Sequence, residues 1–125
     1  MIIKEAIYEL VNEFAPTYYA QADQAASRPL LVISQTGGNR LSTFDAPVDL
    51  RSAEISISAW GNSVKDADEL AQQLDVLEGF AGTVGTIAIQ GIFELNDSDL
   101  YEDPDGQSRG VFGKERIFTV WYKEI

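Results

Sequence analysis

Carboxylates are the side chains of this chain that come closest to forming a chemical site. Between residues 94 and 105 there are six acids and no base, namely Glu94, Asp97, Asp99, Glu102, Asp103 and Asp105. Carboxylate oxygens suit Ca²⁺, but an EF-hand loop also needs a third ligand and a glycine at fixed positions. Tyr101 stands where the third ligand after Asp97 and Asp99 is required. We therefore expect no dedicated metal site, and we interpret the segment as an acidic, solvated hairpin loop.

Other kinds of catalytic site lack the necessary residue types. The chain contains no His and no Cys, so nucleophiles activated by histidine are excluded. A restriction-type nuclease could use Asp105 and Glu115, but Ile117 replaces the lysine expected two places after the second acid. The glycine pair at 37–38 precedes a strand-like stretch, whereas a phosphate-binding loop leads into a helix. We predict that the chain is not an enzyme and uses no cofactor.

The charge balance restricts the possible partners. Twenty acidic residues against nine basic ones give a formal net charge of −11 over 125 residues. A protein that grips nucleic acid needs clustered Lys and Arg, so tight DNA binding is not expected. No apolar run approaches the ~20 residues that span a bilayer, and residues 1–6 lack the pattern of a signal peptide. With 45% hydrophobic residues, the sequence predicts one soluble domain over residues 1–125.

The first third of the chain predicts one helix followed by strands. Apolar residues recur at helical spacing through residues 2–14, and Pro16 ends the pattern. Residues 15–28 indicate an irregular connection in which Tyr18 and Tyr19 could form a short edge strand. The run at 30–35 is rich in branched residues and predicts a buried strand.

A hairpin turn is expected directly after that strand. Residues 36–39 read Thr-Gly-Gly-Asn, and paired glycines accept positive φ readily. Residues 40–44 would then return as the partner strand. Residues 54–60 alternate between apolar and polar side chains, which predicts a half-buried strand. Trp60 lies on its polar phase.

The second half predicts another helix and two long strands. Ser63 is a suitable N-cap with Asp66 three residues later, and Gly79 fits the C-terminal end. The expected buried stripe consists of Ala67, Leu70, Ala71, Leu74 and Leu77. Residues 86–95 and 111–122 indicate strands, the last of them central because both of its phases are largely apolar.

These elements predict an α+β fold in the order α-β-β-β-α-β-β. A mostly antiparallel sheet of four to five strands with two helices on one face would bury both amphipathic helices. Trp60 and the aromatic residues of the last strand provide more apolar surface than packing against the helices requires. This extra surface suggests a contact with a partner or another subunit. The expected contact residues are Trp60, Phe118, Trp121 and Tyr122.

Five stretches carry a resemblance through their joint order and spacing. They are the helix at 3–14, the segment 28–41 (RPLLVISQTGGNRL), the strand 53–61 (AEISISAWG), the helix start at 66–71 and the ending 116–122 (RIFTVWY). Together they resemble the tail-completion, or tail-terminator, proteins of long-tailed, siphovirus-like bacteriophages. The similarity spans nearly the whole chain. The connection at 15–28 and the acidic segment at 94–105 depart from the usual pattern of that family.

The resemblance implies a non-enzymatic structural protein. Such proteins form a hexameric ring that caps the tail tube, stops its growth and meets the head connector. The expected partners are further copies of the chain, a tail-tube protein and a head-completion protein. The expected location is the tail or neck of the virion, after assembly in the host cytoplasm. The acids of 94–105 would face the lumen or the tube, and DNA would pass without being bound.

Two other functions remain open at this point. The chain could be a small acidic adaptor or head–tail connector, or a nucleic-acid mimic that occupies a basic partner without forming a ring. It could also be a metal-dependent hydrolase that uses the carboxylates of 94–105. Oligomeric state separates the ring from the adaptor, and replacement of Asp97, Asp99 and Asp103 by Asn tests the hydrolase.

Overall fold

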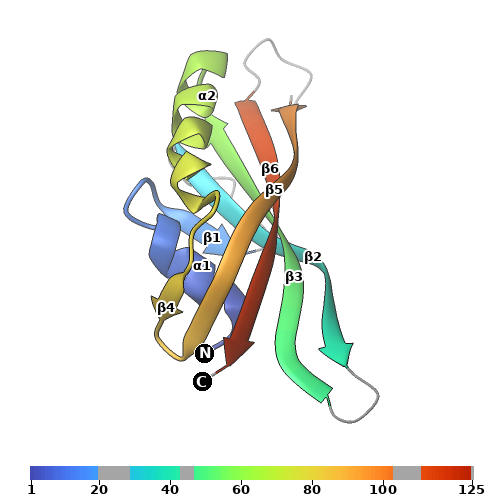
Figure 1. Cartoon of the computed structure of the whole chain (residues 1–125). Helices are drawn as coiled ribbons and strands as arrows, with labels where there is room; N and C mark the ends of the chain where they lie inside the picture. Colours follow the sequence, from blue (N-terminus) through green and yellow to red (C-terminus); the bar gives the residue numbers. More distant parts are fainter. Residues whose placement is uncertain (20–28, 43–46, 103–110, 125) are drawn as a thin grey trace.

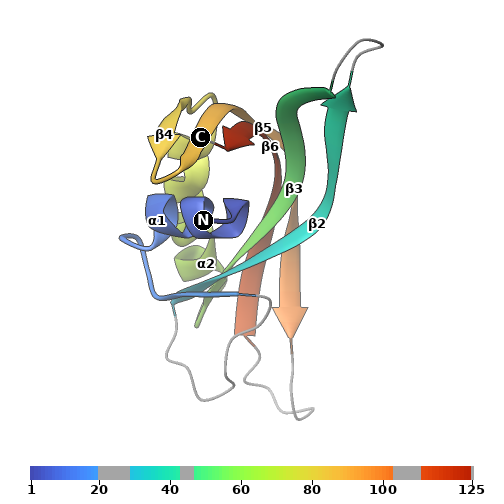
Figure 2. The ribbon, with the colours of Figure 1, turned by 90° about the horizontal axis from the view of Figure 1, so that it is seen from below.

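The computed structural model describes residues 1–19, 29–42, 47–102 and 111–124. It contains one six-stranded sheet with the strand order β1-β2-β3-β6-β5-β4, and the helices α1 and α2 pack on the same side of it (Figures 1 and 2). The α+β class is confirmed. The sheet has more strands than expected, and it is mixed because β1 runs parallel to β2 while every other pairing is antiparallel.

The first helix, α1 (Ile3–Val11), follows from the apolar spacing of its sequence. Ile3, Ala6, Ile7 and Val11 are buried against the sheet, and the last turn closes at Asn12, whose N–H donates to the carbonyl of Tyr8. The helix is therefore shorter than the expected 2–14. The strand suggested for Tyr18 and Tyr19 is present as β1 (Thr17–Tyr19).

The second helix, α2 (Val64–Gln72), begins at the expected cap. The Ser63 hydroxyl oxygen accepts a hydrogen bond from the Asp66 N–H at 3.1 Å. The helix continues into a 3₁₀ segment, η1 (Gln73–Leu77), and all five residues of the expected stripe are buried. Gly79, at φ 75°, adopts the left-handed conformation that favours glycine after a helix.

The hairpin turn expected at 36–39 is wrong, because β2 (Leu30–Ser42) runs straight through it. Its partner is β3 (Pro47–Gly61), paired with it from Leu30 to Ser42. Gly38 serves close packing, because a Cβ there would lie 2.9 Å from the Ser52 carbonyl oxygen. Residues 43–46, which include part of the expected return strand, lie outside the described residues.

The acidic segment is a strand and not a loop over most of its length. β5 (Ile87–Glu102) follows the short β4 (Gly82–Val84) and pairs along its length with β6 (Val111–Glu124). Asp97 and Asp99 lie opposite Arg116 and Lys114 in this pairing, so cross-strand bases accompany the acids. Residues 103–110, with Asp103 and Asp105, lie outside the described residues.

The core lies between the two helices and one face of the sheet. Strand β6 is internal in the sheet, as expected, with β3 on one side and β5 on the other. Its residues Phe118 and Val120 are 1% and 0% exposed, and Ile55 and Ile57 of β3 are also buried. The alternation of residues 54–60 is confirmed, since Ile55, Ile57 and Ala59 face the helices. The opposite face of the sheet carries no helix among the described residues.

Candidate functional site

The face of the sheet opposite the helices is built from the alternate residues of its long strands. We call it the open face, and define it by Trp60, Phe93, Ile117 and Trp121. Register places Trp60 beside Gly113 of β6, and a Cβ on Gly113 would lie 2.8 Å from the Trp60 ring. The indole N–H donates to the Ser58 hydroxyl at 3.2 Å. The ring of Trp60 is therefore seated on its own sheet, with part of its surface left exposed.

Two polar side chains of the open face pair with each other. Ser56 is 3% exposed, and its hydroxyl donates to a carboxylate oxygen of Glu115 at 2.8 Å. Glu115 belongs to the nuclease pattern considered from the sequence, and this hydrogen bond gives it a structural role. Because buried polar groups need partners, the Ser56–Glu115 pair is sufficiently explained by the fold.

Two large apolar side chains of β5 are exposed, one on the open face and one beside it. Phe93 and Leu95 are 50% and 55% exposed. Register shifts at Gln90 and Leu95 interrupt the alternation of the strand, as β-bulges do. Phe93 pairs with Thr119, and its ring lies close over Gly91. Sequence reasoning missed both residues because the bulges break the period of two on which it relied.

On the helix side of the sheet, a buried arginine joins β6 to the end of α2. Arg116 is 8% exposed; its guanidinium donates to Glu94, to Asp75 at 2.6 Å and to the Ala71 carbonyl at 2.8 Å. It also lies 5.3 Å from the ring centre of Phe118. Burial lowers the pKa of Arg116, but the hydrogen bonds to Glu94 and Asp75 outweigh it, so the net shift is upward. Arg116 directly precedes the largely apolar run at 117–122, and this position was the available sequence signal.

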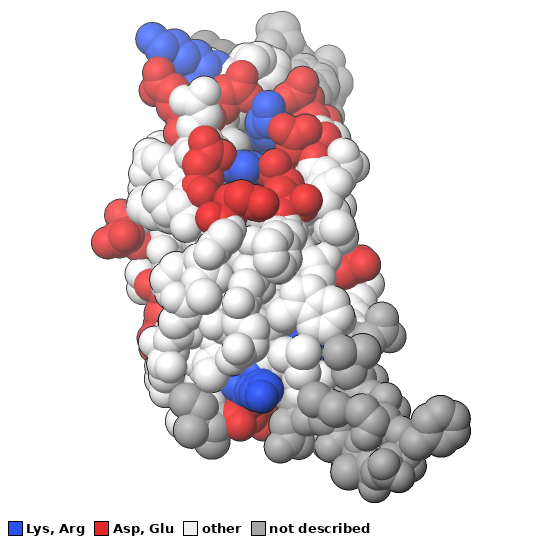
Figure 3. All heavy atoms as spheres, in the orientation of Figure 1, with Lys and Arg blue, Asp and Glu red and all other residues white. Residues whose placement is uncertain are grey.

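Carboxylates surround this arginine on the surface. Asp97 forms an ion pair with Lys114 at 3.8 Å, and Glu78 accepts a hydrogen bond from the Glu94 N–H at 2.7 Å. Figure 3 shows the acids crowded around the bases in the upper half of the view, where α2 and β5 lie in Figure 1. No group of three or more potential ligands close enough for a metal ion occurs among the described residues. The cluster is an acidic surface with internal ion pairs.

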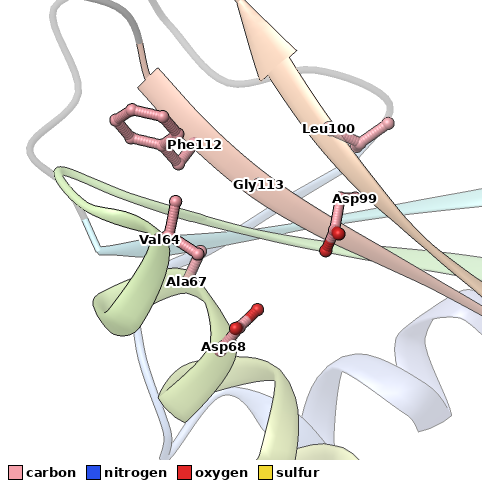
Figure 4. A pocket seen from close by; sticks show the side chains of 7 residues that line it. All are labelled: Val64, Ala67, Asp68, Asp99, Leu100, Phe112 and Gly113. Carbon is pink, nitrogen blue, oxygen red and sulfur yellow. The ribbon is translucent and has the colours of Figure 1, made fainter.

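A small pocket lies where α2 meets the end of β5 and the start of β6. The carboxylates of Asp68 and Asp99 point toward one another across it, and Val64, Ala67 and Phe112 line the rest of the pocket (Figure 4). Its volume is about 210 Å³, below the roughly 300–1,000 Å³ of most small-molecule sites. Its two ionisable side chains are both acids, so the lining offers no acid–base pair with opposed roles. Catalysis gains no support from this pocket.

The residues expected at a partner surface divide between two places. Trp60 and Trp121 lie on the open face, half-buried. Phe118 and Tyr122 are 1% and 8% exposed and lie beneath the helices. Their expected role in a partner contact is corrected on this ground, because the chain's own core covers them.

The expected acidic residues are also only partly placed. Glu94, Asp97 and Asp99 lie on the helix side of β5, as their pairing with Phe118, Arg116 and Lys114 requires. Glu102 ends β5, but its side chain is outside the described part. Asp103 and Asp105 are not described at all. The described acids thus share one side of the sheet and do not form a hairpin tip.

Comparison of the sequence with protein-family models and with curated proteins gave no match. Among the described residues, no helix has the length and apolar character needed to cross a lipid bilayer.

Proposed function

We propose that the chain is a structural protein that assembles into a hexameric ring of the tail-terminator type. The ring would cap a phage tail tube and join it to the head connector. The observation that supports this most is the face of the sheet that no helix of the described residues covers. Large exposed apolar patches on soluble proteins mark interaction sites, and here Phe93 and Leu95 are about half-exposed on the same half of the sheet as the partly exposed Trp121.

A ring needs two different contact surfaces on each copy, because a contact between identical patches closes a dimer. The molecule has unlike surfaces. Its open face carries the exposed Phe93, with Leu95 beside it, whereas its helix side carries the acids around Arg116. Two equivalent acidic sides would repel, so a contact that brings the acidic sides of two copies together is disfavoured.

The negative charge suits a conduit for DNA. Six copies at −11 each would carry a formal charge of −66. Such a ring offers no basic lining that could hold duplex DNA by counterion release. The same charge opposes assembly, so salt or divalent ions should promote ring formation by screening the repulsion.

Native mass spectrometry over a range of protein concentration, with and without Mg²⁺, tests the proposal. We expect a hexamer that becomes more abundant as ionic strength rises. Added to a polymerising tail-tube protein, the chain should shorten the tubes and sit at one tube end in electron micrographs. A chain that stays monomeric at high concentration and leaves tube length unchanged contradicts the proposal, as does tighter assembly at low ionic strength.

A second candidate is a monomeric acidic adaptor or nucleic-acid mimic. The carboxylates that cluster in the upper part of the face drawn in Figure 3 favour it. It predicts binding of a basic protein partner by the monomer, with affinity that falls as salt rises. The two candidates therefore respond to salt in opposite directions.

A further inference from the structure

Both long outer strands of the sheet extend beyond the short strands that cover them. β4 pairs with β5 only at residues 87–89, while β5 continues to Glu102. At the other edge, β1 pairs with β2 only at residues 31–33, while β2 continues to Ser42. Within the described parts of the chain, no strand pairs with the remaining outer edge of either one.

The first part of the free β5 edge is closed by the segment after η1. The Ile92 carbonyl accepts a hydrogen bond from Gly79 N–H at 2.8 Å, and the Glu94 N–H donates to Glu78. Beyond the bulge at Leu95, the register with β6 continues without a break. In an antiparallel pair, alternate residues turn their backbone groups outward. The next outward-facing residues of β5 are therefore Asp97 and Asp99.

Their outward N–H and C=O groups meet no partner among the described residues. A row of such groups is a template for pairing with another strand. The Asp97 and Asp99 side chains oppose pairing between two β5 edges, because like charges would be brought side by side. β2 carries no acidic residue from Leu30 to Ser42, so its edge lacks that obstacle.

The sheet also gives the two edges compatible directions. Three successive antiparallel pairings separate β2 from β5, so the two strands run in opposite directions. A second copy placed alongside in the same orientation presents its β2 antiparallel to the first copy's β5. The free end of β5 lies at the top of Figure 1 and that of β2 at the bottom right, so neighbouring copies must be staggered along the strands. Stagger of this kind is what closure of a sheet into a barrel requires.

We propose that successive copies join by main-chain pairing between the outer edge of β5, at residues 96–100, and the outer edge of β2, at residues 34–38. The ring is then one continuous sheet. Phe93 and Leu95 lie immediately beside the joint, where side chains of the incoming strand cover them. This inference rests on the ring proposed above and specifies how its subunits are held.

The test compares Asp99→Pro with Asp99→Ala. Both remove the carboxylate, but only proline removes the outward N–H, and proline is tolerated on edge strands. Circular dichroism and thermal melting show whether each monomer is folded. Native mass spectrometry under conditions in which the wild type forms rings then measures assembly. We expect D99A to assemble at least as well as the wild type and D99P to remain monomeric.

The outcomes separate this inference from the proposed function. If the wild type itself never assembles, the proposed ring is lost. If the wild type forms rings and a folded D99P forms them equally well, edge pairing is wrong while the ring stands. If D99P does not fold, hydrogen exchange by mass spectrometry on the wild type decides: peptides covering residues 96–100 must exchange more slowly in the ring than in the monomer. Equal exchange overturns the inference.

Discussion

The two faces of the sheet are made from similar residues and yet end in different environments. Along β6, Phe118 and Val120 alternate with Ile117 and Trp121, and both sets are apolar. The first pair is 1% and 0% exposed beneath the helices, while the second pair is half-buried on the open face. The helices of the described residues cover one face of the sheet. The same kind of side chain therefore stabilises the monomer on one side of the sheet and is available for assembly on the other.

The largest expected loss of monomer stability comes from a substitution on the face that the helices cover. Replacing Phe118 by Ala removes a fully buried ring and leaves a cavity in the core, which typically costs about 3–5 kcal/mol. Urea denaturation of the monomer should show that loss in the free energy of unfolding. Thr119→Ala, one residue away on the open face, is the matched control and should cost under about 1 kcal/mol. Similar losses for the two variants would contradict the distinction between the faces.

The helices and the alternation of β3 could be predicted because their signals are local. Apolar spacing, the Ser63 cap and Gly79 are all read within a few residues of where they act. The strand through Gly37 and Gly38 could not be predicted in this way, because pairing with β3 overrides the local preference of these residues for a turn. The acids of β5 are similar: their low strand propensity is overcome by pairing with β6.

The candidate surface was predictable only in part, for a related reason. Trp60 stood out as an aromatic residue on a polar phase, and it lies on the open face. In β6 both phases are apolar, so the sequence alone could not separate Trp121 from Phe118 and Tyr122. Only the packing of the helices decides which phase is covered. Phe93 was hidden by bulges whose positions depend on the register between two strands.

An intermediate effect is expected at the boundary between α2 and the sheet. Arg116→Met keeps much of the side-chain volume but leaves Glu94 and the Ala71 carbonyl without their donor. Leaving buried polar groups unsatisfied costs about 1–3 kcal/mol, measurable by urea denaturation of the monomer. Asp75→Asn is the control: its side chain is 70% exposed, so the loss should be at most about 1 kcal/mol. Equal losses of stability in R116M and D75N would mean that the stabilisation comes from the exposed Arg116–Asp75 ion pair.

The pH dependence of that effect follows from the direction of the shift. The folded-state pKa of Arg116 is raised, so its contribution is complete below the unfolded-state value. It is lost only as pH rises through the folded-state value, far above neutrality. The arginine's own titration therefore adds no pH dependence to the R116M deficit between about pH 6 and pH 8. A deficit that changes steeply across that window would require another titrating group.

The smallest effect on the stability of the monomer is expected from Phe93→Asp, a substitution on the open face. Its ring is half-exposed, so losing it should change the free energy of unfolding by less than about 1 kcal/mol. In the ring the new carboxylate would be desolvated beside Leu95, so association should weaken by at least about tenfold, or about 1.4 kcal/mol.

Ile2→Asp is the matched control, because Ile2 is 53% exposed and precedes α1 on the helix side. Both variants add the same charge, so sedimentation or native mass spectrometry that finds them equally impaired would assign the effect to net charge. A loss of assembly confined to F93D would assign the effect to the open face.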